Sequence, residues 1–221
     1  MTQVSFQKEL LVVLPGLTAM LSQCRQGEAF LRQHSHFDVL YIRFGMRWGT
    51  ARCASRVAQQ LAPIQSNYTK IHFLNYIRGG MSFLAFIKEA SLQNLGNVIF
   101  DRGSAAEQVA KKLSGIFGPL TRIVFGMGVE DVASWKPDQW RWSAPEESRT
   151  GVLIEQGTSR IAKFLGIGPK QIVLPQAFRF DESCEIPESH DDVYTSADFL
   201  RTCIHFFETG TFPSSSPEIT G

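Results

Sequence analysis

Short apolar runs alternate with longer segments of helical period along most of this sequence. Residues 10–14, Leu-Leu-Val-Val-Leu, form a continuous apolar run that stops at Pro15 and Gly16. Such runs are typical of strands that are buried on both faces of a parallel sheet. The runs for which we predict strands are residues 10–14, 37–44, 70–77, 97–100, 120–125 and 171–174.

Helices are predicted in the segments between these runs. Residues 50–64, for example, place Val57, Leu61 and Ile64 on one helical face. The predicted helices are residues 18–33, 50–64, 81–90, 104–117, 152–165 and 195–207. Because strands that alternate with helices form βαβ units, the sequence predicts an α/β three-layer sandwich, in which a mainly parallel sheet of about six strands has helices on both faces.

The length of 221 residues, with 43% apolar and 19% charged residues, fits one medium-sized domain. We assign residues 1–209 to this domain and expect residues 210–221, which are rich in Pro, Ser and Gly, to form a flexible C-terminal tail. Residues 135–150 lack clean periodicity but contain Trp135, Trp140 and Trp142. This segment either covers the carboxyl end of the sheet or is a surface loop held by partly buried indoles.

Charge is nearly balanced, with 22 Lys and Arg against 21 Asp and Glu. This balance argues against nucleic acid or an anionic membrane as the main partner, whereas weak electrostatic repulsion leaves a homo-oligomer or a protein partner open. No run approaches the roughly 18 apolar residues of a membrane span, and the N-terminus has no signal-peptide pattern. We therefore expect no membrane span and a cytoplasmic location.

Cysteine spacing offers no metal site. Cys24, Cys53, Cys184 and Cys203 lie far apart and form no Cys-x-x-Cys pair, so free thiols in a reducing compartment are expected rather than disulfides or metal ligands. Residues 126–131, Gly-Met-Gly-Val-Glu-Asp, lack the third glycine of a dinucleotide-binding loop. The sequence thus predicts neither a metal nor a cofactor.

The junction at residues 75–80, Asn-Tyr-Ile-Arg-Gly-Gly, links a predicted strand to a predicted helix. It resembles the nucleophile elbow of the α/β-hydrolase superfamily of esterases and lipases, in which Gly-x-Ser-x-Gly-Gly lifts a serine onto a tight turn above the sheet. In this alignment Ile77 takes the serine position, Asn75 replaces the first glycine, and Gly79 and Gly80 remain. The resemblance extends over residues 10–207 and rests on the order of elements and on two short motifs.

The resemblance also implies positions for an acid and a histidine. His190, ahead of the last predicted helix, stands where the catalytic histidine of the superfamily lies. Glu130 and Asp131, which follow the predicted strand at residues 120–125, stand at the usual acid position. Asp101, at the end of the predicted strand at residues 97–100, stands at an acid position that some lipases use instead.

The same template implies where a small molecule or an anion would bind. The turn after the first predicted strand matches the His-Gly turn of the oxyanion hole, and the free N–H groups of a helix that begins at Gly79 and Gly80 would suit a phosphate or carboxylate. Arg43 and Arg102 lie at strand ends on the same rim, although such arginines also serve as surface ion-pair partners. The predicted ligand-binding residues are Pro15, Gly16, Leu17, Ile77, Arg78, Gly79 and Gly80.

The departures from the superfamily pattern argue against serine esterase or lipase activity. Ile77 has no nucleophilic atom, and its side chain would fill the space that the attacked carbonyl needs. Three functions stay open: a non-hydrolytic protein that binds a small molecule or a protein partner, an enzyme that uses His190 with an acidic partner as a lyase, isomerase or water-activating hydrolase, and an assembly role as a homo-oligomer.

Overall fold

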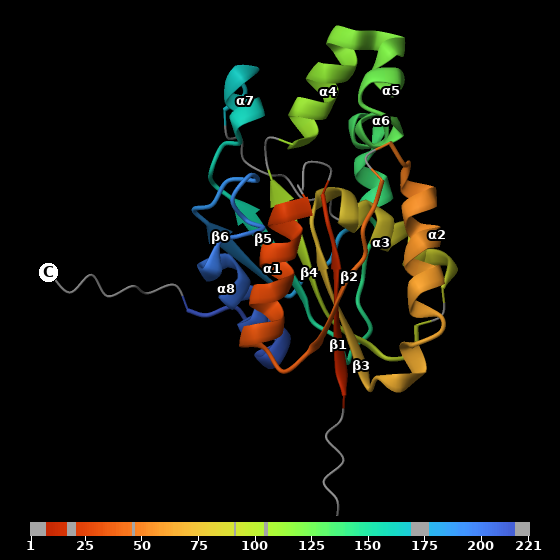
Figure 1. The fold of residues 1–221 in the computed structure, drawn as a ribbon, viewed down its shortest axis with the longest axis vertical. Coiled ribbons are helices and arrows are strands. Elements are labelled where there is room, and N and C mark those ends of the chain that lie inside the picture. Colours follow the sequence, from red (N-terminus) through yellow and green to blue (C-terminus); the bar gives the residue numbers. More distant parts are fainter. Residues whose placement is uncertain are drawn as a thin grey trace, which may run out of the picture.

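The structure of the chain is a computed structural model that describes residues 8–16, 21–45, 47–90, 92–103, 106–168 and 177–214. At its centre lies a six-stranded sheet of order β2-β1-β3-β4-β5-β6, in which every neighbouring pair is parallel. Helices cover both faces (Figure 1), so the predicted fold class is confirmed. The strands are β1 (Glu9–Leu14), β2 (Asp38–Tyr41), β3 (Lys70–Asn75), β4 (Leu95–Gly103), β5 (Thr150–Glu155) and β6 (Glu182–Ile186).

Eight α-helices occur within the described residues. Helices α1 and α8 contact each other on one face of the sheet, and α2 and α3 contact each other on the other face. Helices α4 to α7 gather beyond the carboxyl end of the strands (Figure 1). The helices are α1 (Leu21–His34), α2 (Thr50–Leu61), α3 (Ile77–Glu89), α4 (Ala106–Phe117), α5 (Thr121–Val124), α6 (Met127–Ser134), α7 (Arg160–Phe164) and α8 (Ala197–Thr209).

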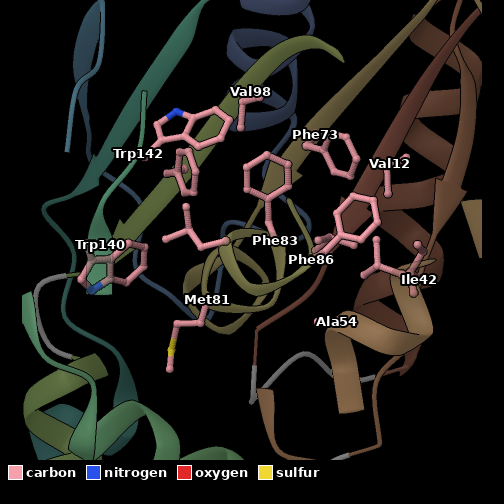
Figure 2. Packing of buried hydrophobic residues seen from close by; sticks show 14 of the residues in the cluster. Val12, Ile42, Ala54, Phe73, Met81, Phe83, Phe86, Val98, Trp140 and Trp142 are labelled. Atoms are coloured by element: carbon pink, nitrogen blue, oxygen red, sulfur yellow. The ribbon is translucent and has the colours of Figure 1, made fainter. Parts of the chain in front are cut away.

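Side chains that alternate along the strands build two cores, because successive residues of a strand point to opposite faces. Figure 2 shows the core under α2 and α3, where Phe73 of β3 packs against Phe83 and Phe86 of α3. On the opposite face, Leu74 and its neighbours pack against α1 and α8, including Phe206. The continuous apolar runs of the sequence are thus explained by burial on both sides.

Two predicted elements are wrong in type. Residues 120–125 contain the helix α5, and residues 152–165 contain most of strand β5 followed by the short helix α7. A short apolar run fits a strand and a buried helical turn equally well. Which of the two forms depends on whether the run is buried in the sheet, and only the tertiary structure decides that. The predicted strand at residues 171–174 lies outside the described residues. The last described strand, Glu182–Ile186, was missed because its exposed residues give it little apolar character.

The tryptophan segment is held by buried indoles, the second of the two predicted alternatives. Trp140 and Trp142 are buried in the core under α3, as Figure 2 shows. Trp142 Nε1 donates a hydrogen bond to Thr150 Oγ1 at 2.9 Å, which fixes the segment against the start of β5.

The described start of the predicted tail packs on the domain. Gly210 ends α8 with a φ of 79°, a left-handed conformation that glycine adopts without strain. Phe212 is buried, and its ring centroid lies 4.5 Å from that of Phe206. The division at residue 209 and the flexible tail stay predictions. Across the described residues, no helix combines the length and the apolar character that a membrane crossing requires.

Candidate functional site

A histidine and a carboxylate meet at the carboxyl end of the sheet. His190 Nδ1 lies 2.8 Å from Glu155 Oε1. Glu155 is the last residue of β5, and His190 lies in the turn between β6 and α8. Parallel strands end at one edge of the sheet, which brings the two residues together. Glu155 was not among the predicted site residues, because residues 152–165 were predicted to form a helix; a strand that ends at residue 155 would have singled out this carboxylate.

Asp101 is the predicted acid that the structure does bring to this place. Its side chain is fully buried on β4, and oxygen or nitrogen atoms of Asp101, Glu155 and His190 lie within 4.8 Å of one another. No donor within the described part of the chain reaches either Asp101 carboxylate oxygen. A proton shared between the Asp101 and Glu155 carboxyl groups would give the Asp101 oxygens a hydrogen-bond partner. Two carboxylates and an imidazole would also suit a divalent transition metal as ligands.

Burial controls the protonation of this cluster. Desolvation and the neighbouring Glu155 raise the pKa of Asp101 well above its ordinary value. Desolvation raises the pKa of Glu155 to about 8, and it lowers the pKa of His190. At neutral pH the carboxyl pair therefore retains a proton, and the His190 imidazole is neutral.

Ile77 lies at the strand-to-helix junction, where the sequence alignment placed it. Tyr76 follows β3 with φ −73° and ψ 161°, and Ile77 is the buried first residue of α3. None of the described non-glycine residues has a positive φ. A β-branched residue would be costly in a left-handed turn, so the chain places Ile77 in an unstrained helical turn in place of the strained elbow of a serine enzyme.

The two glycines after Ile77 are explained by close packing. A β-carbon on Gly79 would overlap the carbonyl oxygen of Leu14 and lie 2.7 Å from the Leu14 carbonyl carbon. A β-carbon on Gly80 would lie 3.1 Å from the Phe100 ring. Both glycines let α3 cross β1 and β4 at short range, a requirement that is independent of any chemistry at the helix N-terminus.

The turn after β1 is closed by a tyrosine. The backbone N–H of Gly16 donates a hydrogen bond to Tyr194 Oη at 3.0 Å, and the Tyr194 ring stacks on Tyr76 at a centroid distance of 4.2 Å. A β-carbon on Gly16 would overlap this hydroxyl and lie 3.3 Å from His190 Nε2. Gly16, Tyr194 and His190 therefore converge, while Pro15 is buried beside them. Leu17 lies outside the described residues.

An apolar cavity of about 180 Å³ lies above Ile77 with His190 in its wall. The helices α4, α5 and α6 supply about half of the lining, and the polar lining residues are Arg78, Ser159, His190 and Asp191. Its apolar lining residues are Ile77, Val109, Ala110, Leu113, Val124, Phe125, Val129, Val132 and Ile161. A larger open hollow near α2 and α6 contains no member of the His190 cluster.

The Arg78 guanidinium holds a loop in place. It is buried, donates hydrogen bonds to the carbonyl oxygens of Gly45, at 3.0 Å, and Trp48, and lies 3.3 Å from Cys53 Sγ. Burial lowers its pKa. Arg102 stacks over the Trp140 ring at 3.9 Å. Anion binding at the Gly79–Gly80 helix N-terminus stays a prediction, and the Arg78 side chain already serves the loop after β2.

Glu130 and Asp131 lie on α6, and neither forms a hydrogen bond or ion pair with His190. Asp131 Oδ2 instead accepts the backbone N–H of Thr50 at 2.5 Å, which caps the N-terminus of α2. We expect Asp131→Ala to lower the free energy of unfolding by about 1 kcal/mol through loss of this cap. Urea denaturation measures the change, and unchanged stability would show that the carboxylate does not act as a cap.

Solved structures share this architecture. The chain is similar to the metagenomic carboxyl esterase MGS0156, with 20% identity over 86% of this chain and 67% of that chain and a TM-score of 0.59. It is also similar to the Bacillus licheniformis lipase BlEst2, with 14% identity over 91% of both chains and a TM-score of 0.60. A third match is YbtT, the type II thioesterase from the yersiniabactin pathway, with 12% identity over 93% of this chain and 95% of that chain and a TM-score of 0.56.

The chain has the α/β-hydrolase fold. No protein-family model matches the sequence, and no curated protein is similar to it. In this α/β-hydrolase fold, Glu155 ends β5, His190 follows β6, and Ile77 follows β3. At these identities the solved structures establish the fold alone.

Proposed function

We propose that this protein binds a compact, mainly apolar molecule in the cavity above Ile77 and does not carry out serine-type acyl transfer. The cavity carries the proposal. Its volume of about 180 Å³ is close to that of an apolar cavity of about 150 Å³ that binds benzene. The few polar side chains in its wall, His190 among them, favour a ligand that carries a hydrogen-bonding group beside its apolar part.

Two features support the exclusion of acyl transfer besides the missing nucleophile. Acyl transfer needs free N–H groups for the oxyanion, but the Gly16 N–H is bonded to Tyr194 Oη. Ile77 also lies in an ordinary helical turn. A serine introduced there would lack the elbow geometry that presents the hydroxyl to a substrate.

We expect no labelling of the protein by a fluorophosphonate probe and no gain of labelling in Ile77→Ser. Both the relaxed turn and the occupied Gly16 N–H oppose attack by the new hydroxyl. In-gel fluorescence detects labelling, with an active serine esterase as positive control. A labelled serine in the unsubstituted protein would overturn the exclusion of acyl transfer.

Ligand binding is testable with benzene and phenol as probes. We expect both to bind, and phenol to bind roughly 2- to 10-fold more tightly because it forms one hydrogen bond with His190. Isothermal titration calorimetry measures both constants. His190→Leu should remove the preference for phenol, and Ala110→Phe, which fills the cavity, should abolish binding of both. Equal binding by Ala110→Phe would place the probes elsewhere and contradict the proposal.

The 2.8 Å contact between His190 and Glu155 favours a second candidate, an enzyme that moves protons without a covalent step. Such an enzyme would exchange the α-hydrogens of a small ketone with solvent. Proton NMR of cyclohexanone in deuterated buffer would detect this exchange, and His190→Leu should lose it. Absence of exchange by the unsubstituted protein would leave ligand binding as the function.

We extend the proposal to a cytoplasmic location. All four cysteines are free thiols, and two of them, Cys53 and Cys203, are fully buried. Free buried thiols are typical of proteins from reducing compartments. Recovery of the protein in a secreted fraction would contradict this assignment.

A further inference from the structure

The large apolar side chains that are most exposed to solvent lie mainly on α4 to α7, the helices that also supply residues of the cavity wall. Phe164 on α7 is 88% exposed and Ile123 on α5 is 66% exposed. Phe180, just before β6, is the one such side chain in the described chain that these segments do not supply. We call the group the apolar rim; its members are Ile116, Phe117, Leu120, Ile123, Val124, Met127, Ile161 and Phe164. A concentration of exposed apolar side chains in one place marks an interaction surface.

The rim is also locally basic. Residues 108–125 and 156–168, which supply all of the rim except Met127, contain no Asp or Glu. Their basic side chains are all exposed: Lys111, Lys112, Arg122, Arg160 and Lys163. The balanced net charge of the whole chain therefore conceals a local excess of positive charge at this surface.

Two groups of helices that carry most of the rim project from the rest of the domain. Figure 1 shows α4 with α5, and α7, projecting past the carboxyl end of the strands. Lys112 Nζ donates a hydrogen bond to the carbonyl oxygen of Leu165, which links the α4 side to the α7 side. Val124 and Ile161 belong both to the rim and to the cavity wall, so an apolar surface continues from solvent to the cavity.

We propose that the apolar rim docks this protein on the surface of an anionic lipid bilayer. Exposed apolar side chains can insert into the headgroup region of a bilayer, which is fluid and needs no complementary shape. The flanking lysine and arginine side chains can pair with lipid phosphates. Each basic residue near an anionic leaflet strengthens binding about fivefold. A protein partner would instead need a surface complementary to apolar side chains that project from several separate helices. The docking surface does not depend on which molecule occupies the cavity.

Co-sedimentation with vesicles tests this proposal. We expect the protein to sediment with vesicles of equal parts phosphatidylcholine and phosphatidylglycerol, and to sediment at least tenfold less with phosphatidylcholine alone. The double variant Phe164→Ser with Ile123→Ser should lower the partition coefficient at least tenfold, because both exposed tips are lost. The double variant Lys111→Glu with Arg122→Glu should abolish the preference for the anionic vesicles.

Matched controls lie outside the rim. Phe180→Ser removes an exposed apolar side chain and Arg56→Glu reverses an exposed charge on α2, and neither should change sedimentation. Far-ultraviolet circular dichroism confirms that each variant is folded. Absence of sedimentation with anionic vesicles, or equal losses in rim and control variants, would overturn the proposal. A concentration-dependent dimer that the Phe164 variant abolishes, without vesicle binding, would assign the rim to a second copy of the chain instead.

Discussion

Gly79→Ala is expected to remove a large part of the stability of the native state. A β-carbon there would overlap the Leu14 carbonyl oxygen and lie 2.7 Å from its carbonyl carbon. Both atoms belong to the backbone of β1, which is hydrogen-bonded to β2 and β3 on either side and cannot move away without disturbing the sheet. Overpacking against side chains typically costs 1–3 kcal/mol, so backbone overlap should cost roughly 4 kcal/mol or more, a large part of a typical total.

Gly115→Ala is the matched control for this substitution. Gly115 lies in α4, and a β-carbon there would have no heavy atom within 4 Å. Since alanine is a better helix former, we expect this variant to be more stable by about 0.5–1 kcal/mol. Guanidinium denaturation measures both changes. Gly79→Ala with native stability would show that α3 does not need this close approach to β1.

Local patterns predicted the parts of the site that lie beside a strand end. The junction was found because the apolar run of β3 ends beside two glycines, but Ile77, the predicted last residue of the strand, is instead the first residue of α3. His190 was singled out from its position ahead of the last helix. The strand before His190, β6, was not predicted, because it has exposed residues at alternate positions and little apolar character.

The remaining parts of the site depend on contacts between distant segments. Glu155 was missed because the apolar run at its strand continues into α7 with a spacing that fits a helix. Tyr194 bonds to Gly16, 178 positions away in the sequence, and nothing in its neighbours signals that contact. The absence of a nucleophile at Ile77 stays a prediction from the sequence, whereas the hydrogen bond from the Gly16 N–H to the Tyr194 hydroxyl is visible only in the structure.

The carboxyl pair next to His190 makes stability depend on pH in a direction opposite to that of most acidic residues. Burial raises the pKa of Glu155 from 4.5 to about 8. Between these values the unfolded chain has lost a proton that the folded chain retains, so the folded state becomes less stable as the pH rises. The pKa of His190 is lowered, and its contribution instead increases stability as the pH rises toward its ordinary value of 6.5. The raised pKa of Asp101 acts in the same direction as that of Glu155, and the His190 contribution partly cancels these two in the unsubstituted protein.

The variant Glu155→Gln isolates the contribution of Glu155 to the pH dependence of stability. The amide keeps the size of the side chain and its contact with His190 but does not titrate, so the loss of stability between pH 5 and pH 8 should shrink by roughly 2–4 kcal/mol. Urea denaturation at a series of pH values measures the difference between the two proteins. Glu185→Gln, an exposed neighbour on β6, should leave the profile unchanged. Identical profiles for Glu155→Gln and the unsubstituted protein would mean that Glu155 is ionised throughout, and the dry, proton-sharing cluster beside the cavity would have to be replaced by a hydrated or cation-bound one.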